Sequence, residues 1–373
     1  MREEISKCAK CGLTGSYRSL DLHGGECKFC RNFQKRSFPG ENRLLKDLDL
    51  QPDEKIGVTV SGGKDSIYMW GVLTELLGAD HILALTYYRP YITSEVALDN
   101  VKKTKNILGT DLLICTDTDA YARFRRNLEI LLEDPKPEAV RVLLCAGCRF
   151  GITERLYREG QKRNVRKFFS GASYLELAPF KEELIEARSP RRNSDEGLER
   201  IIMDYPSMDY GDNLEIIRRD HHYKYKSNET ERGQLKVGSE IRLFDFDDYF
   251  ENDPDRIERI VMQKYGWQKT DRSWHFDCPI EDIKDVFYYG LLGYTEMDFR
   301  TAAMVRYDLL TKEQAHRIIA AEADKLANSY PKMVRILKRH QLEHRMPQLD
   351  ALYRESPWLI FPVEKNMGAE EIG

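Results

Sequence analysis

Short apolar runs alternate with helix-like segments through the first half of the chain. Four runs rich in branched and aromatic residues have the length of buried strands and end in turn-prone residues; they are 56–60, 81–88, 112–115 and 165–169. Between them, residues 67–73 have the apolar density of a packed helix, and 94–108 form a second helix that Gly109 would end. The βαβα order predicts an α/β fold built on a doubly wound parallel sheet.

The second half of the chain has a different pattern. From residue 181 to about 240, charges and prolines break any periodicity, which predicts an insertion or lid in which His221 and His222 form a surface pair. Towards the end the pattern is helical, most clearly over 310–327 and 333–344. We therefore expect four units, which are an N-terminal metal-binding segment, the α/β domain, the insertion, and the end of that domain with a helical C-terminal region; their bounds are 1–38, 39–180, 181–240 and 241–373.

Composition is that of an ordinary globular protein. The chain has 373 residues, of which 41% are hydrophobic and 32% charged. It has no apolar run of membrane-spanning length, and Met1-Arg2-Glu3-Glu4 does not begin a secretory signal, so we expect a cytoplasmic protein without a membrane partner. The net charge of −4 argues against a protein generally coated with nucleic acid.

Two CxxC pairs stand near the N-terminus. Cys8 and Cys11 form the first pair, Cys27 and Cys30 form the second, and fifteen residues lie between the pairs. In a chain expected in the cytoplasm, this spacing is typical of a zinc ribbon with four thiolate ligands, and His23 is not needed as a ligand. A segment this small buries little core of its own, so the Zn²⁺ is predicted to be structural and to supply most of the folding energy.

The most informative motif joins the first predicted strand to the following helix. It reads Ser61-Gly62-Gly63-Lys64-Asp65-Ser66. A strand, a glycine turn and a helix direct backbone N–H groups and the positive end of the helix at one point. The glycines allow a phosphate to approach the backbone, while Lys64 adds a positive charge and the two serines add hydroxyl donors. The motif therefore predicts a pyrophosphate cradle.

Other polar residues are expected around the same crevice. In an open parallel sheet, ligands lie beyond the carboxyl ends of the strands. Thr86 and Asp117 follow two of the predicted strands, and Ser170-Gly171-Ala172-Ser173 follows a third. We expect Thr86 and Gly171 to contribute to cofactor binding.

All six positions of the loop match a known motif. Ser61–Ser66 resembles the PP-loop of the N-type ATP pyrophosphatases, whereas a Walker loop has four more residues between its first glycine and its Gly-Lys pair. The resemblance implies a PP-loop or HUP-like domain that binds ATP and Mg²⁺ and cleaves ATP between the α and β phosphates. It also implies adenylation of a substrate oxygen, with Lys64 and Asp65 as catalytic residues and Asp65 as the magnesium partner. A nucleic-acid-binding module with a vestigial loop is the non-enzymatic alternative, and the intact Lys64 and Asp65 argue against it.

A second cysteine set bears on the transferred atom. Cys145 and Cys148 form a third CxxC, which we expect at the end of a strand near the crevice, and Cys278 stands alone far downstream. Cys115 lies inside an apolar strand and is expected to be a packing residue. The alternative is that Cys145 and Cys148 are a redox pair or packing residues. Three cysteines can hold a 4Fe-4S cluster with one iron open to a ligand.

The three-cysteine layout is similar to that of the iron–sulfur tRNA thiolation enzymes of the PP-loop family. There, too, a CxxC followed by an arginine, here Arg149, lies between the PP-loop and the last strands. This resemblance implies a sulfurtransferase in which sulfide from a donor replaces the adenylated oxygen of a tRNA or small-molecule acceptor.

A competing resemblance covers more of the chain. The ribbon, the PP-loop, Gly266-Trp267, the aromatic stretch 286–290 and residues 304–315 are together similar to the bacterial N-acetyl sugar amidotransferases. That resemblance implies ammonia from a partner glutaminase subunit and a role in surface-polysaccharide biosynthesis. The pseudaminic-acid type of that group does not require the third CxxC, so the sequence favours sulfur transfer and retains the amidotransferase as the alternative. Arg149 and Arg306 are candidates for positioning an anionic substrate, and the acceptor and the oligomeric state, homodimer included, are left open.

Overall fold

A six-stranded sheet stands at the centre of the computed structural model, which describes residues 7–14, 21–146, 155–192, 194–205, 235–237, 241–269 and 277–362. The strand order is β5-β4-β3-β6-β8-β7, and a separate pair of short strands, β1 and β2, lies near the N-terminus. The strands are β1 Leu22–His23, β2 Glu26–Cys27, β3 Ile56–Thr59, β4 Ile82–Tyr88, β5 Asp111–Thr116, β6 Lys167–Ser170, β7 Leu235–Val237 and β8 Ile241–Asp245. The first five strands of the large sheet are parallel, and β7 pairs antiparallel with β8 at one edge.

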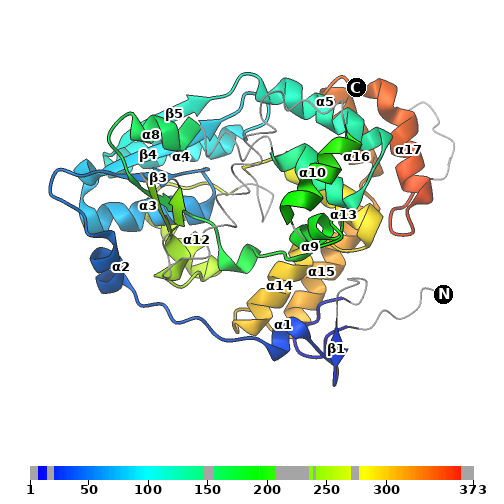
Figure 1. Cartoon of the computed structure of the whole chain (residues 1–373), viewed down its shortest axis with the longest axis horizontal. Helices are drawn as coiled ribbons and strands as arrows, with labels where there is room; N and C mark the ends of the chain where they lie inside the picture. Colours follow the sequence, from blue (N-terminus) through cyan, green and yellow to red (C-terminus); the bar gives the residue numbers. More distant parts are fainter. Residues whose placement is uncertain are drawn as a thin grey trace.

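The α-helices surround this sheet and extend away from it at one end (Figure 1). They are α1 Lys28–Arg31, α2 Glu41–Leu48, α3 Lys64–Leu77, α4 Glu95–Leu108, α5 Ala120–Glu133, α6 Pro137–Arg141, α8 Arg158–Gln161, α9 Phe180–Glu186, α10 Ser194–Asp204, α12 Pro254–Lys264, α13 Ile280–Leu292, α14 Glu296–Arg306, α15 Lys312–Ala327, α16 Tyr330–Arg339 and α17 Met346–Glu355. None of the described helices is long and apolar enough to cross a membrane.

Helices lie on both faces of the sheet. Residues of α3, α4 and α12 bury one face in a common apolar core with β3, β4, β6 and β8. The other face packs against Leu156 and Tyr157, just before α8, in a second core. The central strands are buried on both sides, which is why they read as continuous apolar runs rather than alternating ones. The parallel five-stranded arrangement confirms the expected doubly wound α/β fold.

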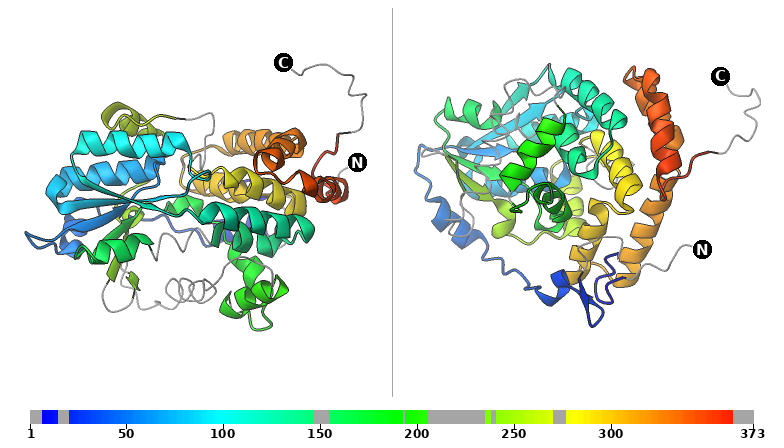
Figure 2. Two further views of the ribbon diagram at one scale, coloured as in Figure 1. Left: turned by 90° about the horizontal axis from the view of Figure 1, so that it is seen from above. Right: turned by 45° about the vertical axis from the view of Figure 1, so that its right-hand side comes forward.

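A third core joins the helical region to the N-terminal segment. It contains residues of α5, α6, α9 and α13–α17 together with the four ribbon cysteines. The ribbon segment lies beside α14 and α15, as Figure 1 and the right-hand view of Figure 2 show. The expected helical C-terminal region is confirmed, and the ribbon is packed onto it rather than standing apart.

Two local expectations were wrong or incomplete. Cys145 does not end a strand, because Val142–Ala146 is a π-helical turn that continues from α6. The apolar run there packs against α5, and Asn127 Nδ2 donates to Leu143 O at 3.0 Å, so its backbone does not join the sheet. The strand β8, which adds a fifth parallel strand after the insertion, had no clear signal in the sequence. His221, His222, Cys148 and Arg149 lie outside the described residues.

Candidate active site

The glycine loop between β3 and α3 has a conformation that only glycine allows at one position. Gly62 has φ of +90°, and a Cβ placed there would lie 2.2 Å from the backbone oxygen of Ala97 in α4. The Gly62 carbonyl accepts hydrogen bonds from Trp267 Nε1 at 3.0 Å and Asn100 Nδ2 at 3.4 Å. The loop therefore packs against α4 and is held by hydrogen bonds from α4 and from the segment after α12.

The first turn of α3 follows directly on this loop. Its N-cap residue, Gly63, provides no side-chain hydrogen bond to the helix, so the helix amides are not covered by a cap. Ser66 Oγ donates to Gly63 O at 2.9 Å and accepts from Ser61 N at 3.2 Å, which holds the loop in a tight turn. A fourteen-residue helix with an uncapped N-terminus and a glycine turn can bind an anion such as phosphate.

Two carboxyl groups lie near Lys64 at this loop. Lys64 Nζ is 2.7 Å from Asp65 Oδ1, and Asn252 Nδ2 reaches Asp65 Oδ1 and Asp247 Oδ2, each at 3.4 Å. Burial raises the pKa of Asp247 to about 7, and the negative charge of Asp65 adds to the shift. A pair of carboxylates joined by an amide suits Mg²⁺ as a donor set. Asp247 follows β8, so it could have been found only by recognising that strand.

The other residues expected at the crevice have different surroundings. Gly171 lies against the start of α3, since a Cβ there would be 3.3 Å from Ser66 Cα. Thr86 is 2% exposed and its hydroxyl donates to Val60 O at 2.9 Å, so it supports the strand that leads into the loop. Burial would raise the pKa of Asp117, but hydrogen bonds from Tyr87 and Arg123 outweigh it and lower the pKa. The part of Thr86 and Gly171 in cofactor binding stays a prediction.

A cavity of about 780 Å³ opens at the carboxyl ends of the strands. Ser61 and Ser66 of the loop line it, and so do Cys145 and Cys278. The structure therefore brings two of the three cysteines expected to hold a cluster to the same cavity as the loop. Cys115 is buried in β5 and does not line the cavity, in keeping with a packing role.

One wall of this cavity consists of buried ion pairs that were not expected from the sequence. Lys181 Nζ and Lys284 Nζ each lie 2.6 Å from a different oxygen of Glu296, and Lys284 Nζ is also 2.6 Å from Glu281 Oε1. All four residues line the cavity. Burial opposes the charge of Lys284, but the carboxylates of Glu281 and Glu296 raise its pKa well above the usual range. These residues come from α9, α13 and α14, so no local pattern could have indicated that they meet.

Of the two arginines considered for substrate positioning, only Arg306 lies in the part of the chain that the structure describes. Arg306 lies over the ring of Phe29 at 5.8 Å and does not line the cavity. Arg300 lies nearly two turns earlier on the same helix, α14. Burial lowers the pKa of Arg300, and the carboxylates of Glu176 and Asp65 oppose that shift. Arg300 is thus a further cation that interacts electrostatically with Asp65 of the loop.

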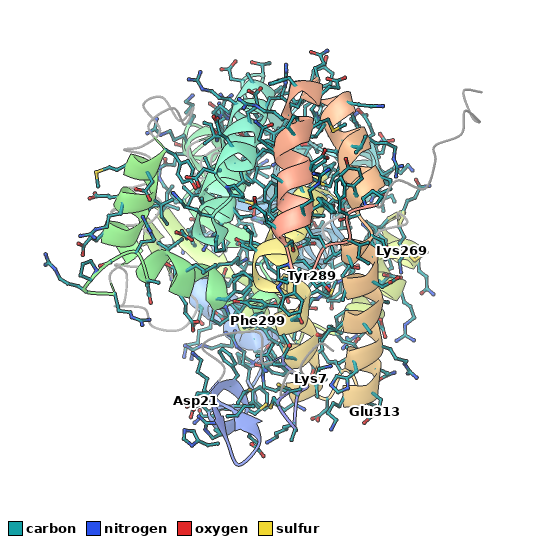
Figure 3. All side chains as sticks on the ribbon, turned by 90° about the vertical axis from the view of Figure 1, so that its right-hand side faces the viewer. Lys7, Asp21, Lys269, Tyr289, Phe299 and Glu313 are labelled. Carbon is teal, nitrogen blue, oxygen red and sulfur yellow. The ribbon has the colours of Figure 1, made fainter. Side chains whose placement is uncertain are left out.

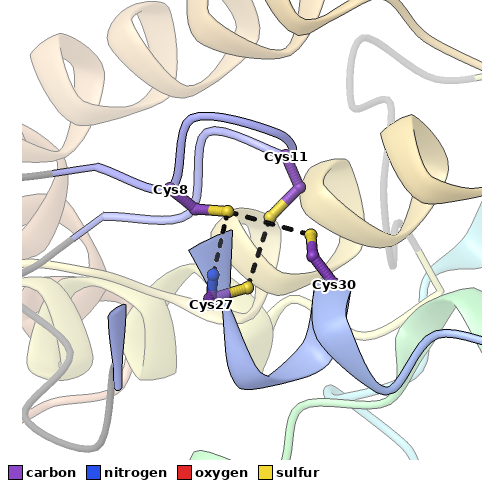
Figure 4. A group of neighbouring side chains, drawn as sticks. All are labelled: Cys8, Cys11, Cys27 and Cys30. Atoms are coloured by element: carbon purple, nitrogen blue, oxygen red, sulfur yellow. Dashed lines mark hydrogen bonds between the residues drawn. The ribbon is translucent and has the colours of Figure 1, made fainter. Parts of the chain in front are cut away.

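The four N-terminal cysteines form a compact, buried group (Figure 4). The sulfur pairs Cys8–Cys30 and Cys11–Cys27 are each 3.8 Å apart, and all four sulfurs lie within 4.8 Å of one another. Sulfurs about 2.3 Å from a tetrahedral zinc would lie about 3.8 Å from one another, so the geometry fits Zn²⁺. His23 is exposed and pairs with Asp21 at 2.9 Å, which agrees with its omission as a ligand.

Comparisons with known proteins leave the family open. No protein-family model matches the sequence, and no curated protein does. Among solved structures, the chain is similar to the U34-tRNA thiolase NcsA from Methanococcus maripaludis with its 4Fe-4S cluster, at 15% identity and a TM-score of 0.36, covering 84% of this chain and 88% of the thiolase. It is also similar to the glutamine-dependent NAD+ synthetase from Acinetobacter baumannii in complex with ADP, at 15% identity and a TM-score of 0.27, covering 73% of this chain and 40% of the synthetase. TM-scores this low support no conclusion about this chain, so its function has to be judged from its own site.

Proposed function

We propose that the protein is an ATP-dependent sulfurtransferase of the PP-loop type. It would adenylate an oxygen of its acceptor, release pyrophosphate and replace that oxygen with sulfur. The observation that carries the proposal is the shared cavity, because Cys145 and Cys278 line the same cavity as Ser61 and Ser66. Two thiols from distant parts of the chain beside a phosphate cradle favour a reaction that couples ATP cleavage to sulfur chemistry.

The loop would carry the adenylation step. The acceptor oxygen attacks the α-phosphorus of ATP, and the bond to pyrophosphate breaks with its electron pair leaving on the pyrophosphate oxygen. The N-terminus of α3, the loop amides and Lys64 would stabilise the negative charge that develops there. Asp65 and Asp247 would hold Mg²⁺, which supplies further charge neutralisation when bound.

The cysteines would carry the second step. Cys145, Cys148 and Cys278 would hold a 4Fe-4S cluster, which supplies an open iron position for sulfide when bound. Cys145 and Cys278 are half-buried, and the buried side chains of Leu144 and Leu156 line the same cavity, so part of its wall is apolar. Sulfide would attack the activated carbon and AMP would leave with the electrons of the carbon–oxygen bond.

Anaerobic purification tests this proposal directly. The protein should be brown and contain about four irons and four sulfides per chain after reconstitution, as expected for a 4Fe-4S cluster. A colourless chain that takes up no iron under these conditions would overturn the sulfur-transfer proposal while leaving the ATP loop intact.

A second candidate is the N-acetyl sugar amidotransferase, which one group of contacts favours. Two residues that carry that resemblance make contacts at the loop and the ribbon. Trp267 Nε1 donates to Gly62 O, and Lys312 Nζ donates to Ala9 O of the ribbon at 3.1 Å. In this case ammonia from a partner glutaminase would replace the adenylated oxygen. Formation of AMP that depends on ammonium chloride and an N-acetyl sugar, by an iron-free protein, would select this candidate.

A further inference from the structure

The second CxxC of the ribbon, the Cys27–Cys30 knuckle, contacts helices α9 and α14, which contribute residues to the cavity wall. Lys28 and Phe29 stand between the ligand residues Cys27 and Cys30, and α1 begins at Lys28. Lys28 Nζ lies 2.9 Å from an oxygen of Glu183 in α9. Lys28, which stands between two ligand cysteines, is therefore turned toward α9.

An aromatic row continues this contact across two more helices. The ring of Phe29 meets Phe299 of α14 edge to face, with centroids 6.1 Å apart. Phe299 in turn stacks on Phe180, the first residue of α9, at 5.1 Å. Figure 3 shows Phe299 on α14 directly beside the ribbon, whose Lys7 and Asp21 are labelled. Phe180 and Phe299 are 1% and 3% exposed, so their positions are set by close packing.

The charged cavity wall lies immediately beyond this row. Lys181 follows Phe180 along α9, and Glu296 precedes Phe299 by one turn of α14. Their side chains form the 2.6 Å ion pair that lines the cavity. The separation of α9 and α14, which the phenylalanine row determines, therefore fixes where this pair sits. A buried ion pair is favourable only with good geometry, so small helix displacements matter.

We propose that the metal ribbon is a positioning element of the reaction cavity. Metal binding holds the Cys27–Cys30 knuckle, and the knuckle holds α9 and α14 through Lys28 and Phe29. The helices then present Lys181 and Glu296 to whatever occupies the cavity. Phe29, Phe180 and Phe299 are positioning residues, since none of them lines the cavity. This inference rests on the proposed function only in taking the cavity as the reaction site.

The structure supplies a matched pair of variants for the test. Phe29→Ala removes the ribbon end of the row, and Phe29→Leu keeps most of its volume. Phe361→Ala is the control, because Phe361 is also half-buried and also has an arginine over its ring, Arg354 at 4.4 Å, but lies beyond α17. Hydrogen exchange of the α9 and α14 amides is measured on zinc-loaded protein, together with zinc content and binding of a non-hydrolysable ATP analogue.

Phe29→Ala should keep its zinc and bind the ATP analogue within about twofold of wild type, while α9 and the first turns of α14 exchange about tenfold faster because a packed cavity wall has opened. Phe29→Leu should restore most of the protection, and Phe361→Ala should leave α9 unchanged. Unaltered exchange of α9 in Phe29→Ala, or an equal rise in Phe361→Ala, overturns the proposal. Hydrogen exchange is measured without an acceptor substrate. A wild-type protein that transfers no sulfur would therefore refute the proposed function, while the exchange of α9 and α14 would still test the positioning role of the ribbon.

Discussion

Substitution of Gly62 by alanine gives the sharpest test of the phosphate cradle, because the chain contains a matched control. Gly62 precedes α3 and Gly78 follows it, and both have φ of +90°. A Cβ at Gly78 meets nothing closer than His81 Cδ2 at 4.0 Å, whereas at Gly62 it meets the Ala97 oxygen at 2.2 Å. Gly78→Ala therefore reports backbone strain alone, and Gly62→Ala adds a collision with the backbone of α4.

The expected costs follow from these two terms. Gly78 has φ of +90° and ψ of +150°, a region almost restricted to glycine, so Gly78→Ala should lower the free energy of unfolding by roughly 1–3 kcal/mol. Overpacking in Gly62→Ala should add about 1–3 kcal/mol. The collision can be relieved only by moving the loop, which would take its backbone N–H groups out of line with the phosphates of ATP. Binding of an ATP analogue should therefore weaken strongly in Gly62→Ala and hardly at all in Gly78→Ala.

Urea unfolding and calorimetric titration measure the two quantities on the same samples. If both variants lose the same stability and both bind the analogue as wild type does, the loop is not packed against the backbone of α4 at Gly62. If Gly78→Ala also loses binding, the effect comes from α3 as a whole and not from the cradle.

Four further substitutions test other parts of the site. Lys64→Ala or Asp65→Ala should abolish acceptor-dependent pyrophosphate release with circular dichroism unchanged, and near-normal turnover in either variant would refute their assignment. Glu296→Ala leaves two buried lysines without their shared carboxylate and should cost about 3–5 kcal/mol of stability in urea, clearly more than Glu281→Ala, after which Lys284 still has Glu296. Burial raises the pKa of Asp247 from 3.8 to about 7, so the folded protein binds this proton more tightly and stability should fall as the pH rises through that range. Asp247→Asn should flatten that part of the pH profile, and an unchanged slope would contradict the buried carboxyl.

Local chemistry could be predicted from the sequence because its signals are contiguous. The strand, glycine turn and helix at Ser61–Ser66 and the paired cysteines of the ribbon each lie within a short segment whose spacing dictates its geometry. The same holds for α4, which ends at Gly109 with φ of +68°, in the left-handed conformation that stops helices.

The rest of the site depends on contacts between distant segments. The ion pairs of the cavity wall involve residues that look like surface charges in the sequence: Lys181, Glu281, Lys284 and Glu296. They are buried together only because three helices pack against one another. Phe29 reads as an ordinary residue between two ligands until α14 is placed beside it. The π-helical turn at Cys145 was mistaken for a strand because a short buried apolar run has no periodicity that separates the two.

Iron content of single cysteine variants tests the central claim most directly. After anaerobic reconstitution, wild type and Cys115→Ser should retain a full cluster and form thiolated product, whereas Cys145→Ser, Cys148→Ser and Cys278→Ser should each lose both, with binding of the ATP analogue preserved. If wild type takes up no iron, or if Cys278→Ser is as active as wild type, the cavity does not carry out sulfur transfer.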